Sequence, residues 1–270
     1  MDSKGVRLDT YLVTTGHAGG REKAKELLAA GYVSVNGATV TKASRRLTDT
    51  DVVACSAPRP RYVGRGGYKL ERAITAAGLS LTGLIAMDVG ASTGGFTDCM
   101  LQQGAARVYA VDVGHDQLHE SLRQDPRVTV LEGTDVRSQA LADAVPGGSI
   151  DFCSVDVSFV SLAHVLPAIL PYLGADATLV CLIKPQFEAG KAAIGKHGVV
   201  KDRKVHARVL ADQLALFAAC RLVPVWMGHS PITGGEGNIE YLAVLRRGES
   251  PAPVIDPVAL TQAAFTELTN

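Results

Sequence analysis

Apolar residues from position 84 onwards form short continuous runs that alternate with segments in which they recur every three or four residues. The runs predict seven strands, at 84–89, 107–112, 128–131, 150–155, 178–183, 222–228 and 239–246. The helically spaced segments predict helices at about 95–103, 116–123, 138–143, 161–172 and 203–219. Such alternation is typical of an α/β fold with a mostly parallel sheet that helices cover on both faces. The sequence therefore predicts an α/β domain with a seven-stranded sheet.

The first 58 residues have a different pattern, two short helices followed by small strands. Helical spacing predicts the helices at about 7–15 and 21–30, and a glycine follows each of them. An alternating strand at 32–35 runs into Asn36-Gly37, which is a strong hairpin signal, and a further strand is expected at 51–55. This segment therefore predicts a compact α+β domain at 1–58.

Proline-containing stretches mark both boundaries of the larger domain. The basic stretch at 59–63 predicts a linker, and the domain then extends over 64–248. Its opening is glycine-rich and leads into a helix that continues to about Ala77. Prolines also separate a tail at 249–270, in which 258–268 can form a short helix.

The chain has 270 residues, of which 47% are hydrophobic, so it is long enough for one large and one small domain. No apolar stretch approaches the ~18 residues of a membrane span, and no secretory segment follows the start, so we expect a cytoplasmic protein. The five cysteines are odd in number and widely spaced, which predicts neither disulfides nor a metal site. The oligomeric state, monomer or weak homodimer, stays open.

The net charge of zero hides an asymmetry between the two ends of the chain. Residues 1–72 hold 13 Lys and Arg against 7 Asp and Glu, and the remainder holds 14 against 20. A basic end is typical of a module that binds phosphates, although unevenly charged solvated faces would give the same count. The candidate nucleic-acid contacts are Arg7, Arg21, Lys23, Lys25, Lys42, Arg45, Arg46, Arg61 and Arg65.

A glycine-rich turn follows the first predicted strand of the larger domain. It resembles the dinucleotide fingerprint G-x-G-x-x-G, but Ser92 stands where the second glycine would approach a pyrophosphate. The turn therefore favours a nucleoside ligand without a pyrophosphate, of which S-adenosylmethionine is the common example, without selecting it. The candidate residues of the turn are Asp88, Gly90, Ala91, Ser92, Thr93, Gly94, Gly95 and Phe96.

Acidic residues follow the next two predicted strands. Asp112, with Val113 behind it, is in the position where a carboxylate accepts hydrogen bonds from a ribose diol. Asp135, with Val136, follows the third strand and can accept a hydrogen bond from an adenine amino group. Either acid alone could be a turn residue or a helix cap, but as a series they favour an adenosine-containing ligand.

Two further strands also end in charged residues. Asp156 follows one strand and Lys184 follows the next, so the two side chains are expected to pair. Such a pair is either a structural salt bridge or a proton-handling lysine, with Lys69 as a second cation nearby. Glu240 begins the last strand and can orient one of the two lysines.

The segment Gly190-Lys196 fits the phosphate-loop formula G-x-x-x-x-G-K, but His197 replaces the required Ser or Thr. No strand directly precedes it and no helix directly follows, so we interpret it as a surface loop over the site. His197 and Lys201 are candidates for contact with substrate there.

The first module resembles the S4 RNA-binding domain. The family pattern R-x-D-x-x-L followed by R-x-x-A-x-x-L-I/L-x-x-G-x-V-x-V-N-G is matched from Arg7-Leu8-Asp9 to Asn36-Gly37. This resemblance implies that the second helix and the following turn lie on structured RNA. A generic α+β capping domain is the alternative.

With Lys69, Asp156, Lys184 and Glu240 in this order around the glycine-rich turn, residues 5–247 resemble the TlyA branch of the FtsJ-like RNA 2′-O-methyltransferases. The resemblance implies a Rossmann-like class I methyltransferase domain in which these four residues surround the target ribose hydroxyl and the turn holds S-adenosylmethionine. It further implies methylation of cytidine in 16S or 23S ribosomal RNA, or in both, with ribosomal subunits as partners. The alternatives are a non-catalytic RNA-binding assembly factor, a small-molecule methyltransferase, and the haemolysin that the family's older name suggests.

Overall fold

The computed structural model describes residues 5–57, 60–195, 197–248 and 253–269. By its internal contacts the chain divides into two compact units, residues 1–61 and 62–270. The start of the predicted linker, at Arg59, and the start of the predicted tail, at 249–252, lie outside the described residues.

The first unit is a pair of helices packed on a small antiparallel sheet with the strand order β2-β1-β3. Its core contains Leu8, Leu12 and Leu28 from the helices and Val33 and Val35 from the central strand, all at most 1% exposed. The elements are α1 (Leu8–Thr14), α2 (Arg21–Ala29), β1 (Val33–Val35), β2 (Ala38–Thr39) and β3 (Val53–Cys55). The predicted order of two helices and then small strands is confirmed.

Asn36 and Gly37 connect β1 to β2 with φ values of 52° and 80°. Positive φ at both central residues is the signature of the tight hairpin turn that Asn-Gly favours. The sequence signal therefore identified this hairpin.

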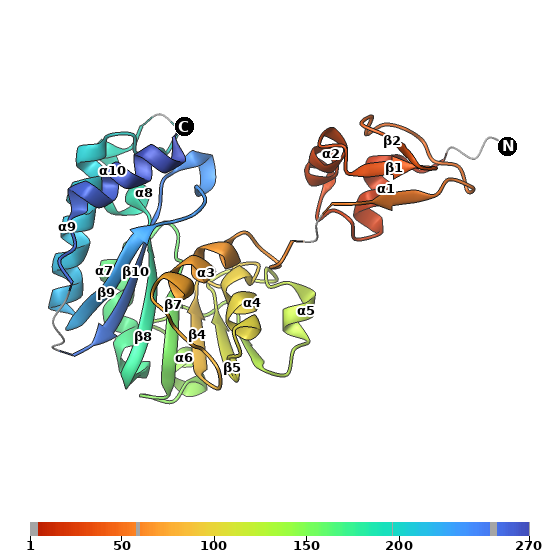
Figure 1. The fold of residues 1–270 in the computed structure, drawn as a ribbon. Helices are drawn as coiled ribbons and strands as arrows, with labels where there is room; N and C mark the ends of the chain where they lie inside the picture. The colour runs from red at the N-terminus through yellow and green to blue at the C-terminus, as the bar shows by residue number, and fades with distance from the viewer. Residues whose placement is uncertain (1–4, 58–59, 196, 249–252, 270) are drawn as a thin grey trace. The chain divides into compact units, whose positions relative to one another are not determined.

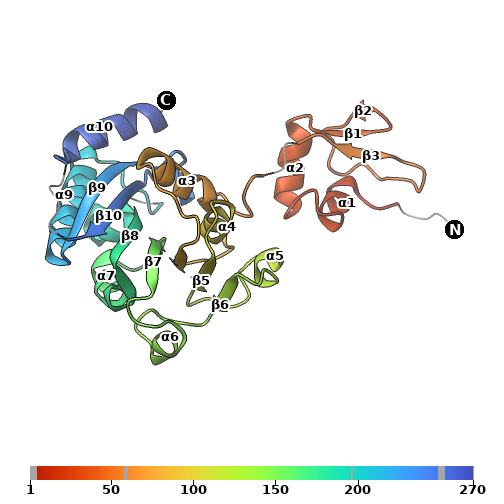
Figure 2. The same ribbon diagram turned by 60° about the horizontal axis from the view of Figure 1, so that its bottom comes forward.

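The second unit contains a seven-stranded sheet in the order β6-β5-β4-β7-β8-β10-β9, shown in Figures 1 and 2. The strands from β6 to β8 pair in parallel, and β10 runs antiparallel to both of its neighbours. Their bounds are β4 (Ile85–Val89), β5 (Arg107–Val111), β6 (Val128–Leu131), β7 (Ile150–Val155), β8 (Leu173–Ile183), β9 (Leu222–His229) and β10 (Tyr241–Arg247). The predicted α/β fold with a mostly parallel seven-stranded sheet is confirmed.

Helices cover both faces of this sheet (Figures 1 and 2). Consecutive strand residues point to opposite faces: Ala86 belongs to the buried cluster that also contains residues of α3, α4 and α5, and Met87 to the cluster that contains residues of α6, α7, α9 and α10. The helical segments are α3 (Gly66–Ala76), α4 (Gly95–Gln102), α5 (Glu120–Arg123), α6 (Gln139–Ala144), α7 (Leu162–Ile169), η1 (Leu170–Tyr172), α8 (Pro185–Glu188), η2 (Lys191–Ala193), α9 (Arg203–Ala219), η3 (Gly235–Gly237) and α10 (Pro257–Leu268).

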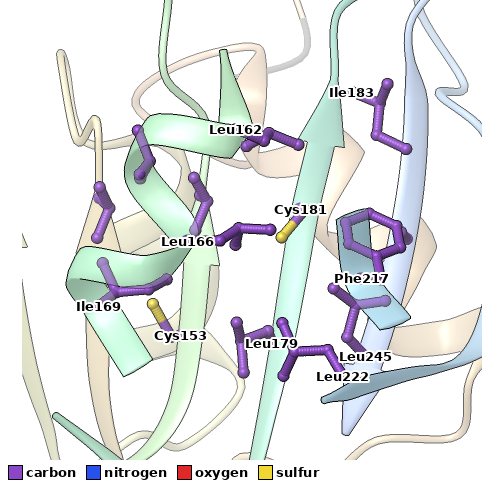
Figure 3. Close-up of a cluster of buried hydrophobic side chains, with 14 of the residues drawn as sticks. Cys153, Leu162, Leu166, Ile169, Leu179, Cys181, Ile183, Phe217, Leu222 and Leu245 are labelled. Carbon is purple, nitrogen blue, oxygen red and sulfur yellow. The ribbon is translucent and has the colours of Figure 1, made fainter. Parts of the chain in front are cut away.

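The core between β8 and the helices α7 and α9 is made of aliphatic, aromatic and sulfur-containing side chains (Figure 3). Leu162 and Leu166 of α7 and Phe217 of α9 pack with Leu179 and Cys181 of β8, and all five are at most 1% exposed. All five cysteines of the chain are free thiols. Among the described residues, no helix is both long enough and apolar enough to cross a membrane.

Three predicted boundaries were wrong, each for a local reason. Strand β8 begins at Leu173 instead of residue 178. The prediction missed its first residues because Ala175 and Asp176 are exposed, so this part of the strand has no apolar pattern. Helix α7 ends at Ile169, and Pro171 lies in the 3₁₀ turn that follows. Helix α5 begins only at Glu120, four residues later than predicted, because Asp116 has φ of 54°, which an α-helix does not contain.

Candidate active site

Four charged side chains from distant parts of the chain meet at one edge of the large sheet. Asp156 and Lys184 follow the carboxyl ends of β7 and β8, and Glu240 directly precedes β10. Because β10 runs antiparallel to β8, its beginning lies at the same edge as the ends of the parallel strands. Lys69 comes from the first turn of α3. We call these four residues the lysine–carboxylate quartet.

The quartet consists of two close ion pairs. Lys69 Nζ donates to Glu240 Oε2 at 2.5 Å, and both side chains are nearly buried, with 11% and 3% exposed. Lys184 Nζ lies 2.6 Å from Asp156 Oδ1 and donates to Ser158 Oγ at 2.9 Å. The expected pairing of Lys184 with Asp156 is therefore present, and Glu240 orients Lys69. Burying charges is costly unless they are paired, so each lysine is held in a defined direction.

The glycine-rich turn between β4 and α4 needs glycine where the backbone is crowded. Gly90 has φ of 86°, and a Cβ there would lie 2.5 Å from the carbonyl oxygen of Asp156. Ser92 also has a positive φ, 48°, although it has a side chain. Its backbone N–H donates to Asp112 Oδ2 at 2.7 Å, which holds this unusual conformation. The turn is therefore packed directly against the quartet.

Asp88 lies behind the turn, inside the sheet. Its carboxylate is fully buried and accepts hydrogen bonds from Thr97 Oγ1 at 2.7 Å and Ser154 Oγ at 2.8 Å. Burial raises the pKa of Asp88 to about 6, against the opposing effect of these two hydroxyl donors. Asp88 thus ties the turn to α4 and β7 from the inside.

Two cavities open on the turn. The larger, of about 500 Å³, extends over the ends of β4, β5 and β7, and the smaller, of about 280 Å³, lies between the turn and the start of α3. Gly90, Ser92 and Asp156 line both. Asp112, Val113, Asp135 and Val136 line the larger cavity; Arg65, Lys69, Ala91, Thr93, Gly95 and Phe96 line the smaller one. Most residues predicted from strand ends and from the turn therefore surround one continuous region.

The two acids of the larger cavity differ in their partners. Both oxygens of Asp112 accept backbone N–H groups, from Ser92 and from Gly114, each at 2.7 Å. Asp135 is held by the guanidinium of Arg137, with Nε and Nη2 at 2.8 and 2.6 Å. The Arg137 side chain and backbone N–H lower the pKa of Asp135 to about 2. Arg137 also lines the cavity and was not identified from the sequence.

The loop before α5 forms another wall of the larger cavity. Glu132 accepts backbone hydrogen bonds from Asp116, Gln117 and Leu118 at 2.8 to 3.0 Å, and Arg123 Nη2 donates to it at 2.5 Å. Asp116 in this loop has φ of 54°, which an α-helix does not contain, so α5 cannot begin at 116 as predicted. Gln117 lines the larger cavity.

The family model described as FtsJ-like methyltransferase matches residues 62–247, and the S4 domain model matches residues 6–53. The chain belongs to the FtsJ-like methyltransferases. The predicted resemblance to this family and to the S4 domain is confirmed.

Individual relatives cover both units of this FtsJ-like methyltransferase. The Bacillus subtilis protein YqxC is 46% identical over 90% of this chain and 86% of its own length. The Mycobacterium tuberculosis 16S/23S rRNA (cytidine-2′-O)-methyltransferase TlyA is 41% identical over 89% of this chain and 90% of its own. A solved Streptococcus thermophilus protein, named as a candidate hemolysin, is 40% identical with a TM-score of 0.76, covering 98% of this chain and 97% of that one.

Besides Arg137, the FtsJ-like site contains two further features that were not predicted from the sequence. Ser158 contacts Lys184, and Phe159 is 90% exposed, adopts a φ of 64° and packs against Phe187 with ring centroids 4.9 Å apart. Ser158 and Phe159 lie two and three positions after Asp156, and this proximity in the sequence is the signal that could have identified them. An exposed aromatic ring beside a charged site is unusual for a residue that serves only packing.

The second missed feature is the turn that precedes Glu240. Gly234 lies so close to the Glu240 carboxylate that a Cβ on this glycine would be 2.1 Å from Oε1. The turn is closed by a hydrogen bond from the Gly234 N–H to the Asn238 carbonyl at 2.8 Å. Arg65 Nη2 donates to the Thr233 carbonyl at 2.9 Å and so links the start of α3 to the same turn. Arg65, which was predicted to contact RNA, therefore also binds the backbone of the turn before Glu240.

The segment with the phosphate-loop formula does not form one. Helix α8 precedes it, η2 occupies part of it, and Lys196 lies outside the described residues. The Val200 carbonyl accepts from His206 at 2.8 Å, and the Val200 N–H donates to Asn238 at 3.3 Å. The chain directly after this segment, at Val200, is therefore anchored next to the turn before Glu240.

The predicted RNA contacts of the S4 unit have different surroundings. Lys23 and Lys25 pair with exposed glutamates three residues away on α2, and Arg46 Nη1 donates to the Gly5 carbonyl at 2.9 Å. Arg45 Nη2 lies 4.0 Å from Asp51. Lys42 and Arg61 are exposed, and Arg7 and Arg21 share one buried acid, as described below.

Proposed function

We propose that this protein transfers the methyl group of S-adenosylmethionine to a ribose 2′-oxygen of ribosomal RNA. The observation that carries the proposal is the lysine–carboxylate quartet beside a cavity whose acids suit an adenosine. The relative named for cytidine-2′-O methylation of 16S and 23S rRNA supports cytidine as the target nucleotide. Because ribosomal subunits are the substrate in this proposal, we expect the enzyme to act in the cytoplasm.

The residues of the larger cavity fit S-adenosylmethionine. Its volume, about 500 Å³, lies within the ~300–1,000 Å³ usual for small-molecule sites. Asp112 is positioned to accept hydrogen bonds from the ribose diol, and Asp135 to accept one from the adenine amino group. The absence of a side chain at Gly90 keeps the backbone open to the ligand. When bound, the cofactor supplies an electrophilic methyl group on a sulfonium.

The quartet can activate the ribose hydroxyl. A lysine ammonium has three N–H donors; Lys184 donates one to Ser158, and its Nζ lies 2.6 Å from Asp156 Oδ1, which has no hydrogen-bond partner among the described residues. The remaining donors are left for the 2′-oxygen, where they stabilise the negative charge that develops as the hydroxyl proton passes to the Asp156 carboxylate. Lys69, held by Glu240, provides a second positive charge at the same place. Since methyl transfer requires an in-line nucleophile, the principal task of these residues is positioning.

The basic residues of the S4 unit and of the region before α3 are proposed to bind the RNA backbone. These are Arg7, Arg21, Lys23, Lys25, Lys42, Arg45, Arg46, Arg61 and Arg65. Phosphate contacts of this kind position an enzyme on RNA without reading its sequence. They explain why a methyltransferase domain would be joined to a separate basic unit, which a small-molecule enzyme does not need.

Mapping of 2′-O-methyl groups on ribosomal RNA tests the proposal. Unmodified 30S and 50S subunits are incubated with S-adenosylmethionine and either the native protein or Lys184→Ala, and the ribose methyl groups are located by alkaline-resistance sequencing. We expect at least one new cytidine site with the native protein and none with the variant. No new site in either subunit would refute the proposal.

Two controls separate the alternative functions. A non-catalytic assembly factor would bind the subunits without producing a new methyl group, whereas a small-molecule enzyme would consume S-adenosylmethionine without labelling RNA. A haemolysin would lyse erythrocytes as pure protein, and would do so equally with Lys184→Ala.

A further inference from the structure

A carboxylate in the S4 unit is buried beneath two of its exposed arginines. Asp9, in the first turn of α1, has no exposed surface. Its Oδ1 and Oδ2 accept from Arg7 Nε and Nη2 at 3.0 and 2.9 Å, and Oδ2 also accepts from Arg21 Nη2 at 2.9 Å. The hydrogen-bonded Arg7 guanidinium, with Arg21, holds the pKa of the Asp9 carboxyl well below its usual range. Asp9 is therefore a charged acid that joins two cations.

The two arginines come from different helices but are brought to one point. Arg7 precedes α1 and Arg21 is the first residue of α2, and their guanidinium groups meet at the same oxygen of Asp9. Their side chains are 40% and 58% exposed. Of the five N–H donors of a guanidinium, Arg7 uses two on Asp9 and Arg21 uses one. Among the described residues, no other acceptor is bound to them.

We propose that Asp9 is a positioning residue that holds Arg7 and Arg21 as one preformed guanidinium pair, and that this pair binds a backbone phosphate of the RNA. The inference rests on the proposed function, because it concerns how the ribosomal RNA substrate is held. A free arginine loses much rotamer freedom when it binds, and fixing both guanidiniums beforehand removes that loss from the binding step. Guanidinium forks suit phosphate oxygens because they can donate two parallel hydrogen bonds.

The lysines of α2 provide the contrast. Lys23 pairs with Glu26 and Lys25 with Glu22, in each case with both partners at least half exposed. Such exposed pairs restrict their partners little and are easily exchanged for water. Removing the charge of Glu26 therefore changes the net charge of the unit by the same amount as removing that of Asp9, without releasing an arginine pair. Glu26→Gln is thus a matched control for Asp9→Asn.

The proposal and simple electrostatics make opposite predictions for Asp9→Asn. If only the net charge mattered, removal of an acid from a basic surface would strengthen binding to a polyanion in both variants. If Asp9 positions the arginines, Asp9→Asn weakens binding, by about tenfold, while Glu26→Gln leaves it unchanged or tighter. Loss of one organised phosphate contact should also reduce the slope of log K against log salt by about 1.

The experiment measures binding of the full-length chain to unmodified ribosomal subunits at several salt concentrations, together with kcat and KM for methyl transfer. We expect Asp9→Asn to raise KM for subunits and to leave kcat and cofactor affinity unchanged. The same substitution is then made in the Arg7→Ala/Arg21→Ala background, where it should have no further effect, since the groups that it positions are gone.

Two results would overturn the inference. Binding that is equal or tighter in Asp9→Asn would show that the carboxylate acts only through its charge. A loss that persists in the Arg7→Ala/Arg21→Ala background would show that the substitution disrupts the S4 unit as a whole. Failure of the proposed function is a separate outcome, because it would appear as absent methylation by the native protein itself.

Discussion

Substitution of Gly234 by alanine should displace the Glu240 carboxylate while keeping its charge, and so test whether its position matters for methyl transfer. The new Cβ would lie 2.1 Å from Glu240 Oε1 and 2.6 Å from its Cδ, so the carboxylate has to move. The backbone would not resist the substitution, because Gly234 has φ of −73° and ψ of −163°, which alanine adopts freely. The variant therefore changes the direction of the Glu240 carboxylate without removing any charge.

The size of the effect follows from this contact. Carbon and oxygen atoms that are not bonded to each other approach to about 3.3 Å, so Oε1 must be displaced by about 1 Å. Lys69 Nζ donates to the other oxygen of this carboxylate, Glu240 Oε2, at 2.5 Å. Displacement of the carboxylate would therefore also change the direction of the Lys69 ammonium. A misplacement of about 1 Å at a catalytic site costs on the order of 10²-fold in rate, or about 2.7 kcal/mol. Overpacking adds about 1–3 kcal/mol of lost folding stability.

Gly235→Ala is the matched control. Gly235, like Gly234, lines the smaller cavity of about 280 Å³, but a Cβ at Gly235 would have no atom within 4 Å. We would measure single-turnover methylation of subunits and cofactor affinity by calorimetry for both variants, with thermal unfolding as a check on folding. Gly234→Ala should lower kcat and retain cofactor binding, and Gly235→Ala should resemble the native protein. Equal loss in the two variants, or normal kcat in Gly234→Ala, would refute the reasoning.

Two further predictions concern the groups around the turn. Lys184→Ala should reduce single-turnover methylation by at least ~10³-fold while calorimetry shows unchanged cofactor affinity, because it removes the cation at the developing oxyanion; normal turnover would eliminate this assignment. Asp88 has its pKa raised by burial to about 6, so its stabilising contribution is complete below its unfolded pKa of about 3.8 and is lost as pH rises through 6. Asp88→Asn should therefore remove up to about 3 kcal/mol of pH-dependent unfolding free energy between pH 4 and 7.5, measured by denaturant titration; an unchanged pH profile would contradict this.

Hydrophobic periodicity identified the architecture because a parallel sheet covered on both faces needs continuous apolar strands. It failed where a strand leaves the core, as at the exposed beginning of β8, and where the backbone adopts a non-helical conformation, as at Asp116 before α5. Both failures depend on contacts that local sequence patterns do not describe.

Three members of the quartet, Asp156, Lys184 and Glu240, could be predicted because each adjoins an apolar strand, and these strand ends meet at one edge of the sheet. Gly234 and Arg137 were not, because their importance depends on which side chain lies beside them. A glycine in a polar turn has no pattern that distinguishes a residue crowded against Glu240 from its neighbour Gly235. Only coordinates give that distinction.

The reversed direction of one strand accounts for how the quartet is assembled. Ligands of parallel sheets lie beyond the carboxyl ends of the strands, and this rule selects residues that follow a strand, such as Asp156 and Lys184. Glu240 precedes its strand, and it reaches the same edge only because β10 is antiparallel to β8, with Tyr241 opposite Ile183. The reversal therefore places a carboxylate beside the strand that ends in Lys184, where it holds Lys69 against the site. A parallel strand in this position would have carried Glu240 to the opposite edge and left Lys69 without that partner.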